Sequence, residues 1–229
     1  MALILSIDTA TENAIVSLGK EEEIIAFKKN EEQKNHASFV QPAILQILKE
    51  NNIEFKQIDA IAVSAGPGSY TGLRVGLASA KGLCFALGTP LILLNTLQVM
   101  SAQVVQELHN SSAYYCPMID ARRMEVFTAI YDYSLKEILL PNPENISDNN
   151  FIEMLSSYKN EIVFFGSGMP KWKATTHQKN FIFYHSALDS PNGINRLAQQ
   201  HFMQKDFADL TYSEPYYFKD FYTTAKING

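Results

Sequence analysis

The sequence predicts an α/β fold of two similar halves, each a mixed sheet flanked by helices. Three short strands, a helix, a buried strand, a glycine-rich turn and a further strand occur in this order twice. The first strand of each half ends at an aspartate, Asp8 or Asp120. The chain has 229 residues, 46% of them hydrophobic, which is enough to bury a sizeable core.

The first half is expected to open with a three-stranded meander, because short apolar runs are joined there by tight turns. After His36 the apolar residues recur every three or four positions, which predicts a helix closing near Asn51. The expected strands are 2–7, 14–18, 24–27, 60–63 and 91–94, and the later helices are 71–87 and one capped by Thr96.

The second half repeats this order without a low-complexity linker before it. The expected strands are 113–119, 125–133, 137–140, 162–165 and 181–184, and the helices are 149–157 and one opened by Ser190-Pro191. The segment 141–143 is expected to be a loop. We place the two halves at 1–110 and 111–229, with the C-terminal tail packing back on the first half.

Composition excludes several classes of protein. Apolar runs are too short to cross a bilayer, and the N-terminus lacks the pattern of a signal peptide. Cys84 and Cys116 are expected to be buried thiols in a reducing compartment. A net charge of -5 argues against a protein that binds nucleic acid by itself. These features predict a cytoplasmic protein without a membrane segment.

A glycine-rich segment after the strand 60–63 is a candidate anion site, because a helix N-terminus presents free backbone N–H groups. The candidate residues, including the two strand-ending aspartates, are Gly66, Gly68, Ser69, Thr71, Asp8 and Asp120. A tight turn capped by Ser69 or Thr71 is the simpler interpretation. For the segment 120–126, a hairpin turn held by local salt bridges is an alternative interpretation that also remains.

The helix 71–87 carries only two charged residues, Arg74 and Lys81, and both fall on one stripe. A helix apolar nearly all round must be buried on more than one side, either within the chain or against a partner. Gly72, Gly76 and Ser79 share the opposite stripe. We predict a partner surface formed by Val40, Ile44, Gly72, Arg74, Gly76, Ser79, Ala80 and Lys81.

No metal or cofactor site is expected. The histidines never pair at the spacing of helical metal ligands, and His36 has Val40 one turn later. Trp172 stands between two lysines, a pattern that indicates either a solvated surface loop or, as the sharper alternative, a contact with RNA.

Several segments resemble the TsaB family, also called YeaZ. They are 4–11, His36 with Pro42, 66–76, 81–82, 120–126 and 215–219, and the run from Gly66 to Arg74 is the specific one. The resemblance implies an actin/hexokinase/Hsp70-like fold of two ribonuclease-H-like halves. It also implies a non-catalytic subunit that dimerises with TsaD, is joined by the ATPase TsaE, and forms a homodimer when alone.

The activity implied by the resemblance is threonylcarbamoyl transfer to the adenosine beside the anticodon of tRNAs that read codons beginning with A. The tRNA would be contacted through the complex. TsaD-like proteins hold a metal through two histidines one helical turn apart; His36 aligns with the first and Val40 replaces the second. Lys34 stands where many relatives carry arginine. Two alternatives stay open: an ATP-dependent small-molecule kinase of the same superfold, and a metallopeptidase.

Overall fold

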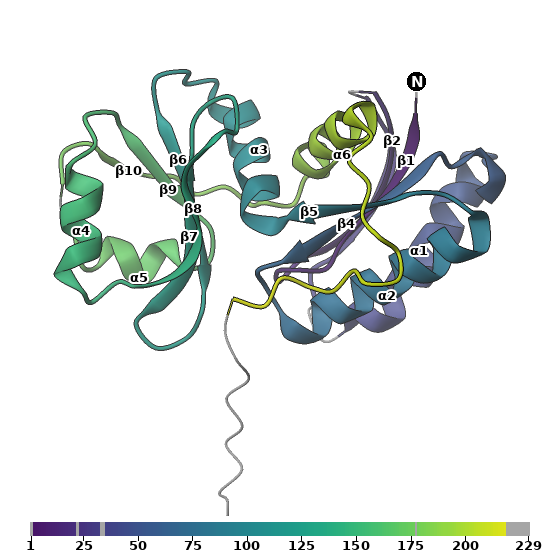
Figure 1. Ribbon diagram of the computed structural model, residues 1–229, viewed down its shortest axis with the longest axis horizontal. Coiled ribbons are helices and arrows are strands. Elements are labelled where there is room, and N and C mark those ends of the chain that lie inside the picture. The colour runs from purple at the N-terminus through teal and green to yellow at the C-terminus, as the bar shows by residue number, and fades with distance from the viewer. Residues whose placement is uncertain (1, 22, 33–34, 177, 219–229) are drawn as a thin grey trace, which may run out of the picture.

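The computed structural model describes residues 2–21, 23–32, 35–176 and 178–218, so Lys34 and Lys219 lie outside the described residues. The chain forms two lobes, and each is built on a five-stranded sheet (Figure 1). The strand order is β3-β2-β1-β4-β5 in the first sheet and β8-β7-β6-β9-β10 in the second, which is the same order by position in each half. The two mixed sheets confirm the predicted fold class.

In the first sheet β2 pairs antiparallel with β1 and β3, while β4 pairs parallel with β1 and β5. Its strands are β1 (Leu3–Asp8), β2 (Ala14–Lys20), β3 (Glu23–Asn30), β4 (Ala60–Gly66) and β5 (Leu91–Asn95). The helices α1 (His36–Glu50) and α2 (Tyr70–Leu87) cover one face, and a 3-10 turn, η2 (Phe55–Gln57), precedes β4. Side chains alternate between the two faces of a strand, so Leu5 and Ile7 pack toward α1 and α2. Ile4 lies on the opposite face, in a core that contains residues of both lobes.

The second sheet has β6 (Tyr114–Asp120), β7 (Glu125–Tyr131), β8 (Glu137–Asn145), β9 (Ile162–Phe165) and β10 (Phe181–Phe183). Helices α4 (Asn149–Ser156) and α5 (Met169–Lys173) belong to this lobe. The expected loop 141–143 is wrong, because β8 continues through Pro141 and Pro143. β8 is the edge strand of its sheet. On the open side of an edge strand there is no neighbouring strand to bond, so a proline, which lacks an N–H, removes no hydrogen bond there.

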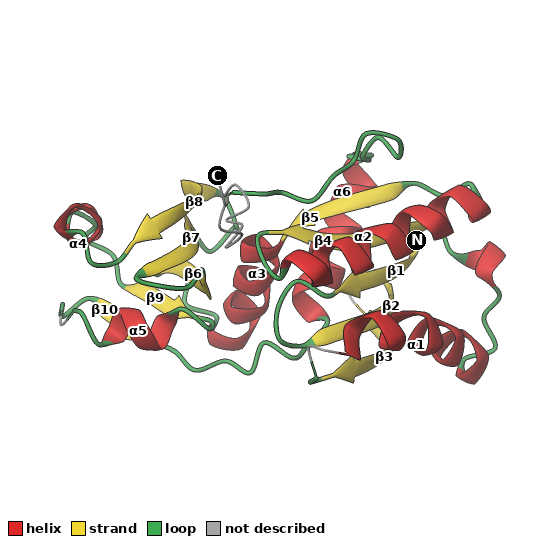
Figure 2. Ribbon diagram, turned by 90° about the horizontal axis from the view of Figure 1, so that it is seen from below, coloured by secondary structure: helices red, strands yellow, loops and turns green. Residues whose placement is uncertain are grey.

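Two further helices pack on the face of the first sheet opposite α1 and α2, and one of them also contacts the second sheet. α3 (Thr96–Leu108) contacts β4 and β5 of the first sheet and β6 and β7 of the second. α6 (Asn192–Gln204) packs on α3 and on the first sheet, although it follows the second lobe in the chain (Figures 1 and 2). A shared apolar core thus joins the lobes. The division at residue 110 stays a prediction. None of the described helices is long and apolar enough to cross a membrane.

Two local predictions need correction. The cap of α3 is Asn95, whose side-chain oxygen accepts from the N–H groups of Leu97 and Gln98 at 2.9 and 3.4 Å, and Thr96 is the first helical residue. Trp172 does not lie in a solvated loop. It sits in α5 with only 1% of its surface exposed, where its ring meets Phe151 at 5.1 Å between ring centroids.

Candidate functional site

The glycine turn between β4 and α2 receives the loop that follows β1. Ser69 caps α2 by accepting from the N–H of Gly72 at 3.3 Å, and its own N–H donates to the carbonyl of Ala10 at 2.7 Å. A side chain at Gly68 would place its Cβ 2.2 Å from that carbonyl oxygen. Thr71 is exposed on the first turn of α2. A backbone carbonyl therefore stands where an anion would need a donor, which favours the tight-turn interpretation.

The two strand-ending aspartates differ in environment. Asp8 accepts from the N–H of Ala10 at 3.1 Å, and burial raises the pKa of its carboxyl. Asp120 is half-exposed and pairs with Lys171 at 2.7 Å, while the N–H of Arg122 donates to it at 2.6 Å. Partial burial opposes them, yet these bonds hold the pKa of Asp120 below its usual value. Asp120 thus closes a salt-bridged hairpin. No hydrogen bond joins it to Asp8, whose carboxylate accepts from Ala10.

Replacing Asp8 by asparagine is expected to raise the free energy of unfolding at pH 7. The pKa of Asp8 is higher in the folded than in the unfolded state, because burial disfavours the charged carboxylate. When Asp8 is ionised, folding must therefore remove its charge from water, and this lowers the free energy of unfolding. Asparagine keeps an acceptor for the N–H of Ala10 without that charge. The gain should fade as the pH falls to about 3, below the unfolded pKa of about 3.9, where the carboxyl is mostly protonated in both states. Urea unfolding at both pH values measures it, and a gain that persisted at the lower pH would contradict the explanation.

The predicted small-residue stripe of α2 faces the protein's own first sheet, which corrects its assignment to a partner. A Cβ at Gly72 would lie 2.0 Å from the carbonyl oxygen of Thr9, and one at Gly76 would lie 2.4 Å from the hydroxyl of Thr9. That hydroxyl donates to the carbonyl of Gly72 at 2.7 Å. Close backbone approach does occur here, but the second backbone is the β1 loop.

Other members of the predicted partner surface are also inside the protein. Val40, Ile44 and Ala80 are fully buried in the core between α1, α2 and the sheet. They cannot touch a partner directly, because the first lobe's own side chains cover them. Of the eight predicted residues, Arg74 is exposed and Ser79 and Lys81 are half-buried.

The outward ridge of α2 carries residues that the sequence analysis did not select. Ala78, Gly82 and Phe85 are exposed along it, and Phe85 leaves 83% of its surface in water. On α1, Leu45 is 57% exposed. Their spacing could have found them, since Ala78 and Phe85 continue the stripe of Arg74 and Lys81. A ridge of small and apolar side chains on two adjacent helices is an unpartnered surface suited to another protein.

His36 lies at the start of α1 with 3% of its surface exposed. Its Nε2 atom is 3.2 Å from the carbonyl oxygen of Glu12, and burial lowers the pKa of the imidazole. Val40, one turn later, points into the core. Across the described part of the chain, no group of three or more His, Cys, Asp and Glu side chains is placed to hold a metal ion.

Comparison with known proteins identifies the family. The family model described as TsaD, tRNA N6-adenosine threonylcarbamoyltransferase, matches residues 25–216. The chain is 30% identical to the tRNA threonylcarbamoyladenosine biosynthesis protein TsaB of Haemophilus influenzae, over 99% of this chain and 97% of the relative. The chain belongs to the TsaB family. The TsaB of Escherichia coli is 26% identical over 99% of this chain and 98% of its own.

A solved structure agrees with the fold of this TsaB-family chain. YeaZ from Pseudomonas aeruginosa superposes with a TM-score of 0.80 at 21% identity, covering 95% of this chain and all of the other. The two-lobed arrangement therefore matches the actin/hexokinase/Hsp70-like fold that the resemblance implied.

Proposed function

We propose that this chain is the accessory subunit that TsaD requires for threonylcarbamoyl transfer to tRNA in the cytoplasm. The observation that carries the proposal is the match to TsaB relatives over nearly the whole length of both chains. Val40 supports it, because the position of the second metal-binding histidine of TsaD-like proteins is filled by a core side chain. The carbonyl of Ala10 at the N-terminus of α2 disfavours the kinase alternative.

The exposed residues Leu45, Ala78, Gly82 and Phe85 form what we call the α1–α2 ridge. TsaD is the proposed partner of this ridge, and a second copy of this chain occupies it when TsaD is absent. Phe85 and Leu45 supply apolar anchors, while Ala78 and Gly82 allow another helix to approach closely. The first half, 1–110, carries these helices, and 111–229 completes the second half and the tail. TsaE joins the complex, and tRNA is held mainly by TsaD, since this chain has a net charge of -5.

Reconstitution tests the proposal. Purified TsaD, TsaE, the synthase that makes the threonylcarbamoyl adenylate, and unmodified tRNA are combined with and without this chain. Modified adenosine is then measured by mass spectrometry of digested tRNA. We expect product only when the chain is present, and none from the chain without TsaD. Product at an undiminished rate without the chain, or from the chain alone, would refute the accessory role.

A further inference from the structure

The segment that follows α6, residues 208–218, crosses the first lobe and ends against the second; we call it the strap. It begins at the free edge of the first sheet, where the N–H of Ala208 donates to the carbonyl of Leu91 at 2.9 Å. The strap then turns at Asp209, whose carboxylate accepts from the N–H groups of Thr211 and Tyr212. From there it runs beside α2, on the side away from α1 (Figure 2).

Both charged residues of α2 hold the strap. The ammonium group of Lys81 donates to the carbonyls of Thr211 and Ser213 at 3.2 and 3.0 Å. The guanidinium of Arg74 donates to the hydroxyl of Tyr217 at 3.0 Å and lies 5.9 Å from the centre of the same ring. A cation over an aromatic face and a cation on backbone carbonyls are directional contacts, so they fix the position of the strap along the helix.

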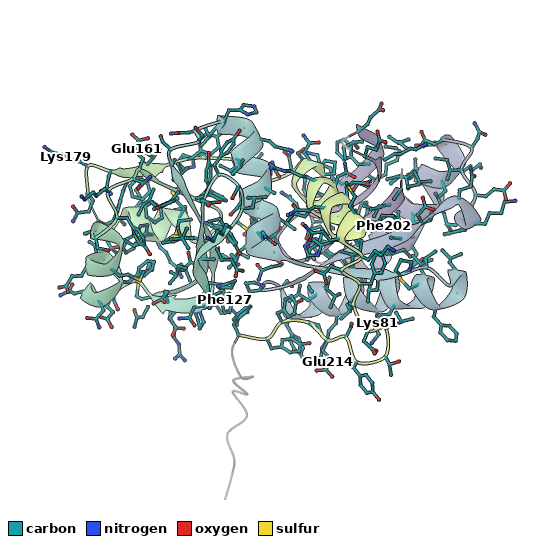
Figure 3. The ribbon with its side chains drawn as sticks, turned by 45° about the horizontal axis from the view of Figure 1, so that its top comes forward. Lys81, Phe127, Glu161, Lys179, Phe202 and Glu214 are labelled. Atoms are coloured by element: carbon teal, nitrogen blue, oxygen red, sulfur yellow. The ribbon has the colours of Figure 1, made fainter. Side chains whose placement is uncertain are left out.

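The strap next meets the glycine turn and then the second lobe. The N–H of Tyr216 donates to the carbonyl of Ala65 at 2.7 Å. Gly66 has φ +124°, and a Cβ there would lie 2.8 Å from the carbonyl oxygen of Tyr216. The ring of Phe218 lies 6.3 Å from that of Phe127 in β7, between centroids. Figure 3 shows Lys81 and Glu214 beside each other, with Phe127 near the end of the strap.

The strap lies where it can restrain the two lobes relative to each other. The covalent crossings between lobes, 109–113 and 184–191, lead to and from α3 and α6, which cover the opposite face of the first sheet. The strap lies on the α2 face, so it restrains the lobes from the other side. Its contacts are few and partly exposed, and such segments open locally without global unfolding. We propose that the strap is a releasable clamp that fixes the relative orientation of the two lobes and is held by Arg74 and Lys81.

The test uses the full chain and the double variant Arg74→Ala/Lys81→Ala, with Lys20→Ala/Lys49→Ala as the control for lost charge. A second variant, Tyr216→Pro, removes the N–H that bonds Ala65 without altering α2. Amide hydrogen exchange of the strap reports release, which we expect to be at least tenfold faster in both test variants. If neither variant speeds this exchange, Arg74 and Lys81 do not hold the strap and the proposal fails.

Lobe orientation is measured by spin labels at Lys56→Cys and Lys179→Cys, exposed positions in the first and second lobes. The native cysteines are buried and should stay unlabelled. We expect one narrow distance distribution in the parent and control, and a broader one in both test variants. Faster strap exchange with an unchanged distance distribution would overturn the clamp, since the strap would then be only a docked tail. Both readouts use this chain without TsaD, and an excess of unlabelled chain removes distances between copies, so neither readout depends on the proposed function.

Discussion

Replacing Gly76 by glutamate is expected to unfold the protein. A Cβ at this position would lie 2.4 Å from the hydroxyl of Thr9 and 3.4 Å from a methyl group of Val63. The larger side chain would also bury a carboxylate with no cation placed to receive it. We expect the free energy of unfolding to fall by about 4 kcal/mol or more, because overpacking and an unpaired buried charge act together. Soluble yield and urea unfolding measure the loss.

The same helix provides matched controls for this prediction. Gly76→Ala adds only the clashing Cβ and should cost about 1–3 kcal/mol. Gly82 has nothing within 4 Å of its virtual Cβ, so Gly82→Ala should stabilise the helix by about 1 kcal/mol through propensity alone. If Gly76→Glu folded with the parent's urea midpoint, the stripe would not pack on the β1 loop as described.

The order of strands and helices could be predicted because short-range patterns determine it. β9 occupies 162–165 as expected, and α1 begins at His36 where the apolar spacing changes. β8 is the exception. Two prolines are typical of a loop, and only its place at the edge of the sheet explains why they are tolerated in a strand.

The packing partners of α2 could not be predicted from its own sequence. The stripe of Arg74 and Lys81 indicates the outward side, but an apolar pattern over the rest of the helix does not distinguish packing on its own sheet from packing on a partner. The decisive contact comes from Thr9, which lies in a loop 63 residues before Gly72 in the chain. The partners of Arg74 and Lys81 are still farther along the chain, at separations of 143 and 130 residues.

Trp172 shows the same limit in the second lobe. The two neighbouring lysines indicate a solvated segment, but only Lys173 is exposed, while Lys171 pairs with Asp120 and the indole turns inward. The indole then packs among Phe151, Phe164 and Phe181, which come from three other elements. Only the tertiary arrangement brings these rings together, so local composition predicted the wrong environment.

Phe85→Asp is expected to abolish association with TsaD while leaving the chain folded. The ring is 83% exposed in the isolated protein, so its loss removes little packing and should hardly shift the melting temperature. In the proposed complex the ring becomes a buried anchor, and an aspartate there would be desolvated without a cation. We expect the dissociation constant to rise at least 100-fold, which corresponds to about 3 kcal/mol.

Met203→Asp is the matched control, because Met203 is 82% exposed on α6, which covers the other face of the first sheet. Titration calorimetry with TsaD, together with sedimentation of the chain alone, compares the two variants. Since the proposed homodimer uses the same ridge, Phe85→Asp should weaken self-association as well, and Met203→Asp should change neither equilibrium. Leu45→Asp on α1 should follow Phe85→Asp, because both side chains rise from the α1–α2 ridge. If TsaD bound folded Phe85→Asp and Leu45→Asp with the parent's affinity, the partner would dock on another face and the assignment of this ridge would be wrong.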